Sequence, residues 1–540
     1  MSQSLVMALA QQNFLVGDIA GNAQRIVELS RQAQQQGADL IVFSELALTG
    51  YPPEDLLLRP SLQTRVEQGL QQIAAASQDI AIVLGFPWRE NGQLFNCAGF
   101  WHGGECLGRY AKQCLPSYQV FDEHRYFSVG DQPCVIDWRG HKLALTVCED
   151  IWHKQPVAQA AAAGADLVLN INASPFHQGK HSERVNLLAS HARRHNLSLL
   201  YVNQVGGQDE LVFDGASFAI SATGEPVLQL PAYAEALGLV RWQQGRLSAL
   251  TASAEAHTDT LGSLYQALVC GVRDYVEKNR FPGVLLGLSG VIDAALTLAI
   301  AVDALGAERV KAVMMPFAYT SDISKADAAE QASIMGVEYS SISIEPMYNA
   351  FMQQLAGEFA GLPVDTTEQN LQARCRGVLL MALSNKSGAM VLTTSNKSES
   401  AVGYSTLYGD MAGGYCALKD VYKTQVFALA EYRNSLSPVI PQRVLERPPS
   451  AELAPDQKDE DNLPPYAVLD AILARYIEQD MSADAIIADG FAAEDVLRVI
   501  RLVDINEYKR RQAPIGVRVS QRGFGRDRRY PVVNGWKAGI

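Results

Sequence analysis

Three residues of different chemistry stand at or near the ends of short apolar runs, where a strand would hold them rigidly. Cys148 follows LALTV, Glu45 closes LIVFSE, and Lys112 lies in GRYAKQCLPSY. A thiol in such a place suits attack on an acyl group, a carboxylate can take the thiol proton, and an ammonium can stabilise an oxyanion. Each also has an ordinary alternative, because free cysteines are usually small buried side chains and most Glu and Lys are surface charges. Together the three favour an acyl-transfer site.

A second site is indicated by GLSGVIDA, residues Gly287 to Ala294, which follows an apolar run and opens a helical stretch. Backbone N–H groups in such a turn, with the positive end of the following helix, form a pocket for phosphate. A Gly-x-x-Gly turn is weak evidence alone, since many such turns are only tight connections. The loop therefore needs support from other segments.

The elements that would position these residues alternate along the chain. Buried strands are predicted at LIVFSE, AIVLGF, LALTVCED, DLVLNINAS and LSLLYVNQ, with helices such as residues 23–36 between them. This alternation is typical of an α/β layered fold. The small, polar stretch GRLSALTASAEAHTDTLG lacks periodicity and is the best linker candidate. We therefore expect domains at residues 1–250 and 263–540, joined by a linker at 251–262.

Two further segments test this organisation. Residues 284–302 are apolar enough to be mistaken for a membrane span, but Gly287, Gly290 and Asp293 near the middle favour a strand, a glycine turn and a buried helix. No membrane association is expected. Residues 440–466 are rich in proline and contain the charge run QKDEDN, which predicts a long irregular segment.

Composition narrows the class of protein. The chain has 540 residues, 48% of them hydrophobic and 19% charged, which excludes a disordered chain and a small disulfide scaffold. The net charge of −13 argues against a nucleic-acid partner, although residues 506–540 are basic. Eight cysteines without a CxxC pair predict free thiols, and the histidines form no zinc-ligand pattern. The first residues lack a basic export signal, so we expect a cytoplasmic protein.

The first site resembles a known family. FSELALTGYPPEDLL, GRYAKQCLPSYQVFDE and LTVCEDIW are similar to the Glu, Lys and Cys motifs of the nitrilase superfamily, in its glutamine-amidotransferase branch. The resemblance implies an α-β-β-α sandwich in which Glu45 is the general base, Lys112 the oxyanion stabiliser and Cys148 the nucleophile. It further implies glutamine-binding positions at Tyr118, Ser174 and Lys180. Glu123 matches either an extra glutamate near such sites or a structural cap.

The second half resembles another family. TEQNLQARCRG, LTTSNKSES, STLYGDMAGGY and RPPSAELAPDQKDEDNLPPY are similar to segments of NAD synthetases of the ATP-pyrophosphatase type, which implies a doubly wound parallel sheet. Both halves follow the order of glutamine-dependent NAD synthetases. The family's phosphate loop usually reads SGGxDS, whereas here Val291 replaces the second glycine and Ala294 the closing serine. If position 291 needs positive φ, its side chain costs about 1–2 kcal/mol. Three explanations stay open: impaired ATP chemistry, a repacked turn that keeps activity, or deliberate substitution.

The resemblance also implies ligands and a reaction. Deamido-NAD would be amidated to NAD with ammonia from glutamine, through an adenylylated nicotinate, with release of AMP and pyrophosphate. The enzyme would form a homo-oligomer and use Mg²⁺ held by Asp293 and Glu399. The ATP positions are Gly287, Leu288, Ser289, Gly290, Val291, Ile292, Asp293, Ala294 and Thr394, and the deamido-NAD positions are Asn370, Glu399 and Lys509. Part of the basic end would then meet substrate phosphates. Two alternatives are a glutaminase or amidase with an impaired second half, and a nucleotide-binding sensor without turnover.

Overall fold

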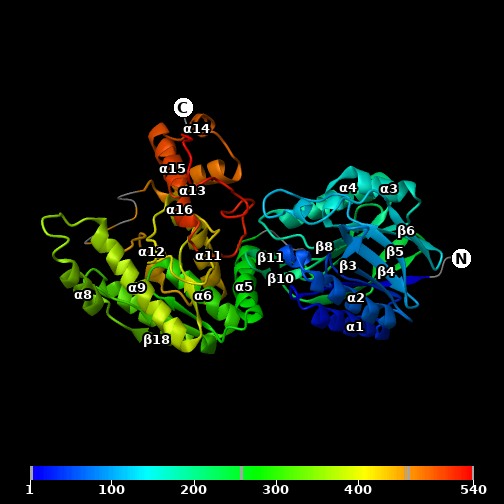
Figure 1. Ribbon diagram of the computed structural model, residues 1–540, viewed down its shortest axis with the longest axis horizontal. Coiled ribbons are helices and arrows are strands. Elements are labelled where there is room, and N and C mark those ends of the chain that lie inside the picture. Colours follow the sequence, from blue (N-terminus) through cyan, green and yellow to red (C-terminus); the bar gives the residue numbers. More distant parts are fainter. Residues whose placement is uncertain (1–3, 256–259, 455–456, 458, 460–462, 538–540) are drawn as a thin grey trace. The chain divides into compact units, whose positions relative to one another are not determined.

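The computed structural model describes residues 4–255, 260–454, 457, 459 and 463–537 (Figure 1). The chain divides into two compact units, Met1–Asp259 and Thr260–Ile540. This division falls inside the predicted linker at 251–262, of which residues 256–259 lie outside the described part of the chain.

Two sheets form the N-terminal unit. One has the strand order β15-β14-β1-β2-β3-β4-β5 and the other β13-β12-β9-β8-β7-β6, and a two-stranded ribbon pairs β10 with β11. The strands are β1 Leu5–Gln11, β2 Leu40–Val42, β3 Ala81–Glu90, β4 Gln93–His102, β5 Glu105–Ala111, β6 Cys134–Trp138, β7 His141–Val147, β8 Leu167–Asn172, β9 Ser198–Asn203, β10 Val205–Gln208, β11 Leu211–Asp214, β12 Phe218–Ile220, β13 Pro226–Gln229, β14 Ala236–Gln243 and β15 Arg246–Ala249. The helices are α1 Ile19–Gln35, α2 Pro60–Ala76, α3 Lys154–Ala162 and α4 Lys180–His195.

Strand alternation makes these sheets the inner layers of an α-β-β-α sandwich. In β1, Met7 and Leu9 belong to a core shared with β7 and β8, whereas Ala8 and Ala10 belong to a core shared with α1 and α2. Successive side chains of a strand point to opposite faces, so β1 is buried on both sides. A third core packs the other sheet against α3 and α4. The predicted fold of this half is confirmed.

The predicted strands occur as expected, and their direction explains where the site lies. β1, β2 and β3 pair in parallel, and so do β7, β8 and β9. Glu45 lies just beyond the carboxyl end of β2, Cys148 follows β7, and Ser174 follows β8. Glu45 thus leaves one sheet, and Cys148 and Ser174 leave the other. The carboxyl ends of the two packed sheets meet there, since the N–H of Ala173 donates to Glu45 Oε2.

The C-terminal unit is built on five parallel strands in the order β18-β17-β16-β19-β20. Their bounds are β16 Val284–Gly287, β17 Val310–Met314, β18 Glu338–Ser341, β19 Met390–Thr393 and β20 Tyr415–Cys416. The helices are α5 Leu261–Lys278, α6 Ile292–Leu305, α7 Asp322–Met335, α8 Glu345–Leu355, α9 Thr366–Ser387, α10 Lys397–Val402, α11 Lys423–Leu436, α12 Gln442–Glu446, α13 Tyr466–Leu473, α14 Ala483–Ala488, α15 Ala493–Ile505 and α16 Glu507–Arg510. The strand order reverses at β16, as in doubly wound sheets, where ligands bind at the reversal.

The predictions for residues 284–302 and 440–466 have different outcomes. Residues 284–302 form β16, a turn and most of the buried helix α6, as predicted, and in the described part of the chain no helix is long and apolar enough to cross a bilayer. Residues 440–466 were expected to be irregular throughout, and this is wrong for α12. That helix starts directly after Pro441, whose fixed φ is compatible with a helix start.

The basic end of the chain folds back onto acidic groups. Arg518 pairs with Asp527 at 2.7 Å, Arg528 with Asp504 at 3.4 Å, and Arg522 bonds Asp480. These ion pairs are internal to the C-terminal unit, so much of the positive charge is neutralised there.

Candidate active sites

A buried cluster of charge forms the first site. Lys112 Nζ lies 2.7 Å from Glu45 Oε1 and 2.9 Å from Glu123 Oε2, with its side chain fully buried. Asn96 donates to Glu45 Oε1 at 2.8 Å, and Tyr51 donates to Glu123 Oε1 at 2.9 Å. Glu123 is therefore part of the charged cluster. Because buried charges are tolerated only when paired and hydrogen-bonded, this network fixes both the carboxylates and the ammonium.

Charge and burial set the protonation of this cluster. Burial lowers the pKa of Lys112, but Glu123 and Glu45 outweigh it and raise that pKa well above its usual range. Burial raises the pKa of the Glu123 carboxyl to about 7. Lys112 is thus a permanent cation beside two carboxyl groups, which is the arrangement that can stabilise a developing oxyanion.

Cys148 lies beside this cluster on a strained turn. It opens the short helix Cys148–Trp152 directly after β7, and its φ of +43° lies in the left-handed region that non-glycine residues rarely adopt. A nucleophile on a sharp turn at a strand end presents its reactive atom to a pocket. Burial and then the charge of Glu45 raise the pKa of the thiol well above its usual range, against the opposing effect of Lys112. The thiol therefore keeps its proton until a neighbouring base removes it.

Asp150 ties the nucleophile turn to the lysine strand. Its fully buried carboxylate accepts from the N–H groups of Val147 at 2.9 Å, Gln113 at 3.1 Å and Cys114 at 2.8 Å, and from Tyr110 Oη at 2.9 Å. One carboxylate thus spans the residues just before Cys148 and those just after Lys112. The sequence showed Asp150 next to Cys148, but nothing in the sequence indicated these distant partners.

The three predicted glutamine positions have defined partners. Tyr118 Oη donates to Glu149 at 2.9 Å, Lys180 Nζ lies 3.7 Å from the centre of the Trp152 ring, and Ser174 is buried. The backbone beside Ser174 is linked to the charged cluster, because the N–H of Ala173 donates to Glu45 Oε2 at 3.0 Å. Tyr118 and Lys180 thus contact the turn that Cys148 opens, and the Ser174 segment is tied to Glu45.

The second site begins at the turn between β16 and α6. Gly290 has a φ of +77°, and a Cβ there would lie 2.1 Å from the Ser324 carbonyl oxygen, so only glycine fits. Val291 has a φ of −117°, an extended conformation open to any residue. The condition for strain at Val291 is therefore not met, since the left-handed position of this turn is Gly290. α6 starts at Ile292 without a side-chain cap, so its first N–H groups remain available to a ligand.

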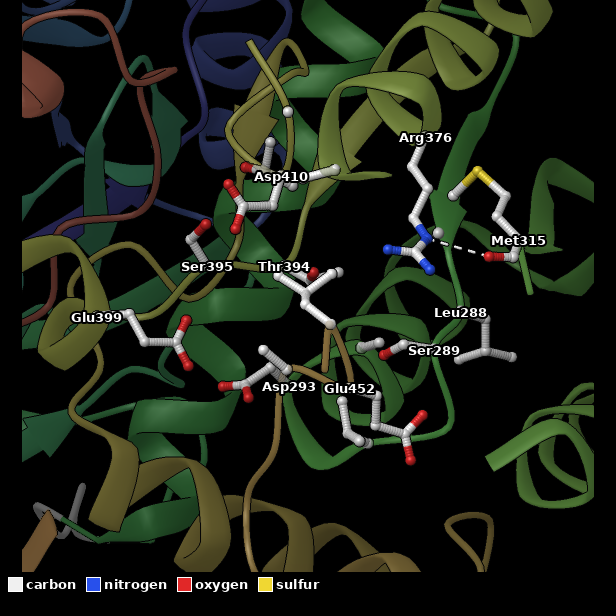
Figure 2. Close-up of a pocket in the computed structure, with 18 of the residues that line it drawn as sticks. Leu288, Ser289, Asp293, Met315, Arg376, Thr394, Ser395, Glu399, Asp410 and Glu452 are labelled. Carbon is white, nitrogen blue, oxygen red and sulfur yellow. Dashed lines mark hydrogen bonds between the residues drawn. The ribbon is translucent and has the colours of Figure 1, made fainter. Parts of the chain in front are cut away.

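A cavity of about 230 Å³ surrounds this turn (Figure 2). Every residue of the predicted phosphate loop except Gly290 lines it, together with Thr394 and Glu399. Lys423 Nζ lies 3.0 Å from Glu399 Oε1 and also bonds Asp293 Oδ2. Burial raises the pKa of Glu399 to about 8, with Asp293 and Asp459 adding to the shift and Lys423 opposing it. Two carboxylates therefore converge on one buried ammonium.

Asn370 and Lys509 lie elsewhere. Neither Asn370 nor Lys509 is among the described residues that line the large cavity. Asn370, inside α9, accepts from Thr406 Oγ1 at 2.8 Å. Lys509 Nζ donates to the Gly403 and Ser405 carbonyls, both at 2.7 Å, and borders a hollow of about 20 Å³ that shares Thr393 and Ser395 with the large cavity. Neither Asn370 nor Thr394 caps a helix, because Asp365 caps α9 and Asn396 caps α10.

Sequence reasoning missed several cavity residues. Arg376, Asp410 and Glu452 line the cavity from three different segments (Figure 2). All three belong to the segments that resemble NAD synthetases, so the resemblance is the signal that could have found them. Lys423 was missed entirely, because its partners Asp293 and Glu399 are distant in sequence.

The folds and sites define a two-unit α/β enzyme, with a carbon–nitrogen hydrolase unit followed by an NAD synthase unit. Residues 6–251 match the carbon–nitrogen hydrolase profile, and residues 264–513 match the NAD synthase profile. The glutamine-dependent NAD(+) synthetase of Acinetobacter baylyi is 53% identical over 99% of both chains. That of Aquifex aeolicus is 43% identical over 98% of this chain and 99% of the relative.

A solved structure agrees with these relatives. Glutamine-dependent NAD+ synthetase from Acinetobacter baumannii, in complex with ADP, is 50% identical over 100% of both chains, with a TM-score of 0.81. The enzyme from Cytophaga hutchinsonii is 21% identical and shares the fold, with a TM-score of 0.84 over 99% of this chain and 98% of its own. The chain belongs to the family of glutamine-dependent NAD(+) synthetases, which are carbon–nitrogen ligases.

Proposed function

We propose that the N-terminal unit releases ammonia from glutamine at Cys148 and that the C-terminal unit uses it to amidate deamido-NAD to NAD at the expense of ATP. The observation that carries the proposal is the buried contact of Lys112 with Glu45, 2.7 Å apart, beside the strained Cys148 turn. Base, cation and thiol are the three groups that amide cleavage through a thioester needs.

In the first half-reaction, Glu45 takes the proton of the Cys148 thiol as sulfur attacks the carboxamide carbon of glutamine. The Lys112 ammonium stabilises the oxyanion of the tetrahedral intermediate. The carbon–nitrogen bond then breaks, and Glu45 returns the proton to the departing ammonia. Water, deprotonated by Glu45, hydrolyses the glutamyl thioester to glutamate and restores the thiol.

Glutamine is held by polar groups around this centre. Tyr118, Ser174 and Lys180 are the proposed binding residues. Tyr118 contacts Glu149 and Lys180 contacts Trp152, both on the turn that Cys148 opens. Ser174 follows Ala173, whose N–H donates to Glu45. Lys180 supplies a cation suited to the α-carboxylate of an amino acid.

In the second half-reaction, the nicotinate carboxylate of deamido-NAD attacks the α-phosphorus of ATP and pyrophosphate leaves. The turn at Ser289 and Gly290 and the start of α6 present N–H groups to the phosphates, and Thr394 faces the same cavity. The Acinetobacter baumannii relative was solved in complex with ADP, which supports the binding of an adenine nucleotide by this chain. Ammonia then displaces AMP from the adenylate to give NAD.

Asp293 and Glu399 are the proposed Mg²⁺ ligands. Their oxygens converge on Lys423, and hard oxygen ligands suit Mg²⁺, which proteins usually hold through one or two carboxylates plus substrate phosphates. Within the described residues no group of three or more acidic, His or Cys side chains could hold a metal ion. When bound, the ion would neutralise phosphate charge during transfer.

The remaining assignments concern the second substrate and the assembly. Asn370, Glu399 and Lys509 are the proposed deamido-NAD contacts. A homo-oligomer is proposed from the resemblance to glutamine-dependent NAD synthetases, and light scattering would test it. A cytoplasmic location is supported by eight cysteines that form no disulfide.

One assay tests the activity as a whole. ATP, Mg²⁺ and deamido-NAD are supplied with either glutamine or ammonium chloride, and NAD, glutamate and pyrophosphate are measured. The proposal expects NAD and pyrophosphate from both nitrogen donors. Glutamate without NAD would instead indicate a glutaminase with an inactive second unit, and nucleotide binding without any product would indicate a sensor.

A further inference from the structure

A buried arginine lies beneath the proposed glutamine site. Arg184, on α4, is 1% exposed, and its Nη1 donates to Asp214 Oδ1 at 2.8 Å and Oδ2 at 2.9 Å. Asp214 ends β11 and is fully buried. Burial lowers the pKa of Arg184, but Asp214 outweighs it and raises that pKa above its usual range. The guanidinium is therefore charged, and its charge is balanced inside the protein.

The rest of the guanidinium is directed at Ser174 and at the carbonyl of the next residue, Pro175. Nη2 donates to Ser174 O at 2.8 Å and to Ser174 Oγ at 3.1 Å, and Nε approaches the same Oγ at 3.3 Å. Nη2 also reaches the Pro175 carbonyl at 3.1 Å. Asn203 holds the other side, accepting from the Ser174 N–H at 2.9 Å. Ser174 is thus fixed in both backbone and side chain.

This arrangement decides which way the Ser174 hydroxyl acts. A hydroxyl has one donor proton and two acceptor lone pairs, and a guanidinium can only donate. With Nε and Nη2 of Arg184 both directed at Oγ, its acceptor capacity is used and its proton must be donated elsewhere. Tyr201, a buried neighbour of Ser174 and Arg184, has no hydrogen-bond partner for its hydroxyl among the described residues. The Ser174 proton is therefore available to an acceptor on a bound ligand.

We propose that Arg184, held by Asp214, is a positioning residue of the glutaminase site that presents the Ser174 hydroxyl as a hydrogen-bond donor to the substrate. The inference rests on the proposed function, in which Ser174 binds glutamine. Arg184 acts through Ser174 and not on the reacting atoms. It therefore governs the KM for glutamine far more than kcat, and it leaves ammonia-driven synthesis unchanged.

Two variants test this role in the full-length enzyme. Arg184→Lys keeps a cation beside Asp214 but loses the planar guanidinium that bonds Ser174. Arg184→Met combined with Asp214→Asn removes both buried charges, and proteins often tolerate the replacement of a whole buried ion pair. Each should raise the KM for glutamine about 10-fold or more, with kcat at saturating glutamine changed less than about 3-fold. Arg194→Met, on the exposed face of the same helix, is the matched control and should behave as the parent.

The coupling to Ser174 separates positioning from general support of the fold. Ser174→Ala should raise the KM for glutamine, and adding Arg184→Lys to it should cause little further change. Two outcomes would overturn the role of Arg184 and leave the assignment of Ser174 standing. One is that the two substitutions raise the KM for glutamine independently, so that their effects multiply. The other is that Ser174→Ala raises this KM while both Arg184 variants leave it unchanged. An unchanged KM in Ser174→Ala would overturn the assignment of Ser174 to glutamine binding and this inference with it.

Discussion

At the scale of single residues, the glutaminase site depends on side chains that hold the reacting residues in position. Glu45, Lys112 and Cys148 could be found from the sequence because each stands at or near the end of an apolar run. Asp150 and Arg184 could not be assigned roles, because their partners lie on other elements: Asp150 bonds Gln113 and Cys114, and Arg184 bonds Asp214. Only the folded sheet brings such groups together. Sequence therefore predicts the reacting groups better than the groups that position them.

Asp150→Asn should lower glutamine-driven activity selectively. An amide cannot accept from all the N–H groups that now surround the carboxylate, so the Cys148 turn and the Lys112 strand lose their common anchor. We expect kcat/KM for glutamine to fall about 10- to 100-fold, from the loss of hydrogen bonds to a charged group. Ammonia-driven NAD synthesis should be unchanged. Asp137→Asn, an exposed carboxylate on β6, is the control, and equal rates in both variants would refute the role of Asp150.

Glu123 should make the N-terminal unit sensitive to pH. Its pKa is raised from about 4.5 to about 7 in the folded protein, so between these values the folded state keeps a proton that the unfolded chain releases. Stability from this group is therefore full below about pH 4.5 and declines as the pH rises to about 7. Glu123→Gln, which stays neutral, removes that decline.

Tryptophan fluorescence measures this effect, because five of the six tryptophans lie in the N-terminal unit. Melting temperatures of both proteins are compared from about pH 5 to pH 8. The melting temperature of the parent should fall more steeply with pH than that of Glu123→Gln. Parallel curves would show that Glu123 does not carry the shifted proton.

At the scale of elements, both sites lie where parallel strands end. The strand, turn and helix at residues 284–302 were predictable because glycines interrupt a long apolar run. The conformation of each turn residue was not, since φ depends on neighbours such as Ser324 that approach from α7. The short helix α12 was missed for a related reason, because proline was taken to break helices where it also starts them.

Gly290→Ala should impair nucleotide binding in both donor reactions. The new Cβ would meet the Ser324 carbonyl at 2.1 Å in a residue with φ +77°, so the turn must move and the phosphate cradle with it. We expect the KM for ATP in the ammonia-driven reaction to rise at least about 30-fold. Gly245→Ala, which has the same φ of +77° but no atom within 4 Å, separates backbone strain from collision. An ATP KM unchanged by Gly290→Ala would mean that this turn does not hold the phosphates.

At the scale of the whole molecule, two units with separate sites carry out one synthesis. The order of the units, their fold classes and the family were all predictable, because the motifs span almost the entire chain. The contacts of the second substrate were not, since Asn370 and Lys509 lie outside the large cavity and bond to protein groups instead. The central claim is the division of labour, in which the N-terminal unit supplies ammonia and the C-terminal unit consumes it.

The most direct test is the rate of NAD formation by Cys148→Ala, measured with glutamine and separately with ammonium chloride, beside the buried-cysteine control Cys97→Ala. The account predicts that glutamine-driven synthesis falls below about 1% of the parent rate, because no other group can form the thioester. Ammonia-driven synthesis should stay within about 2-fold of the parent, since the thiol has no part in the second half-reaction. Equal loss with both donors, or synthesis from glutamine that survives, would contradict the account.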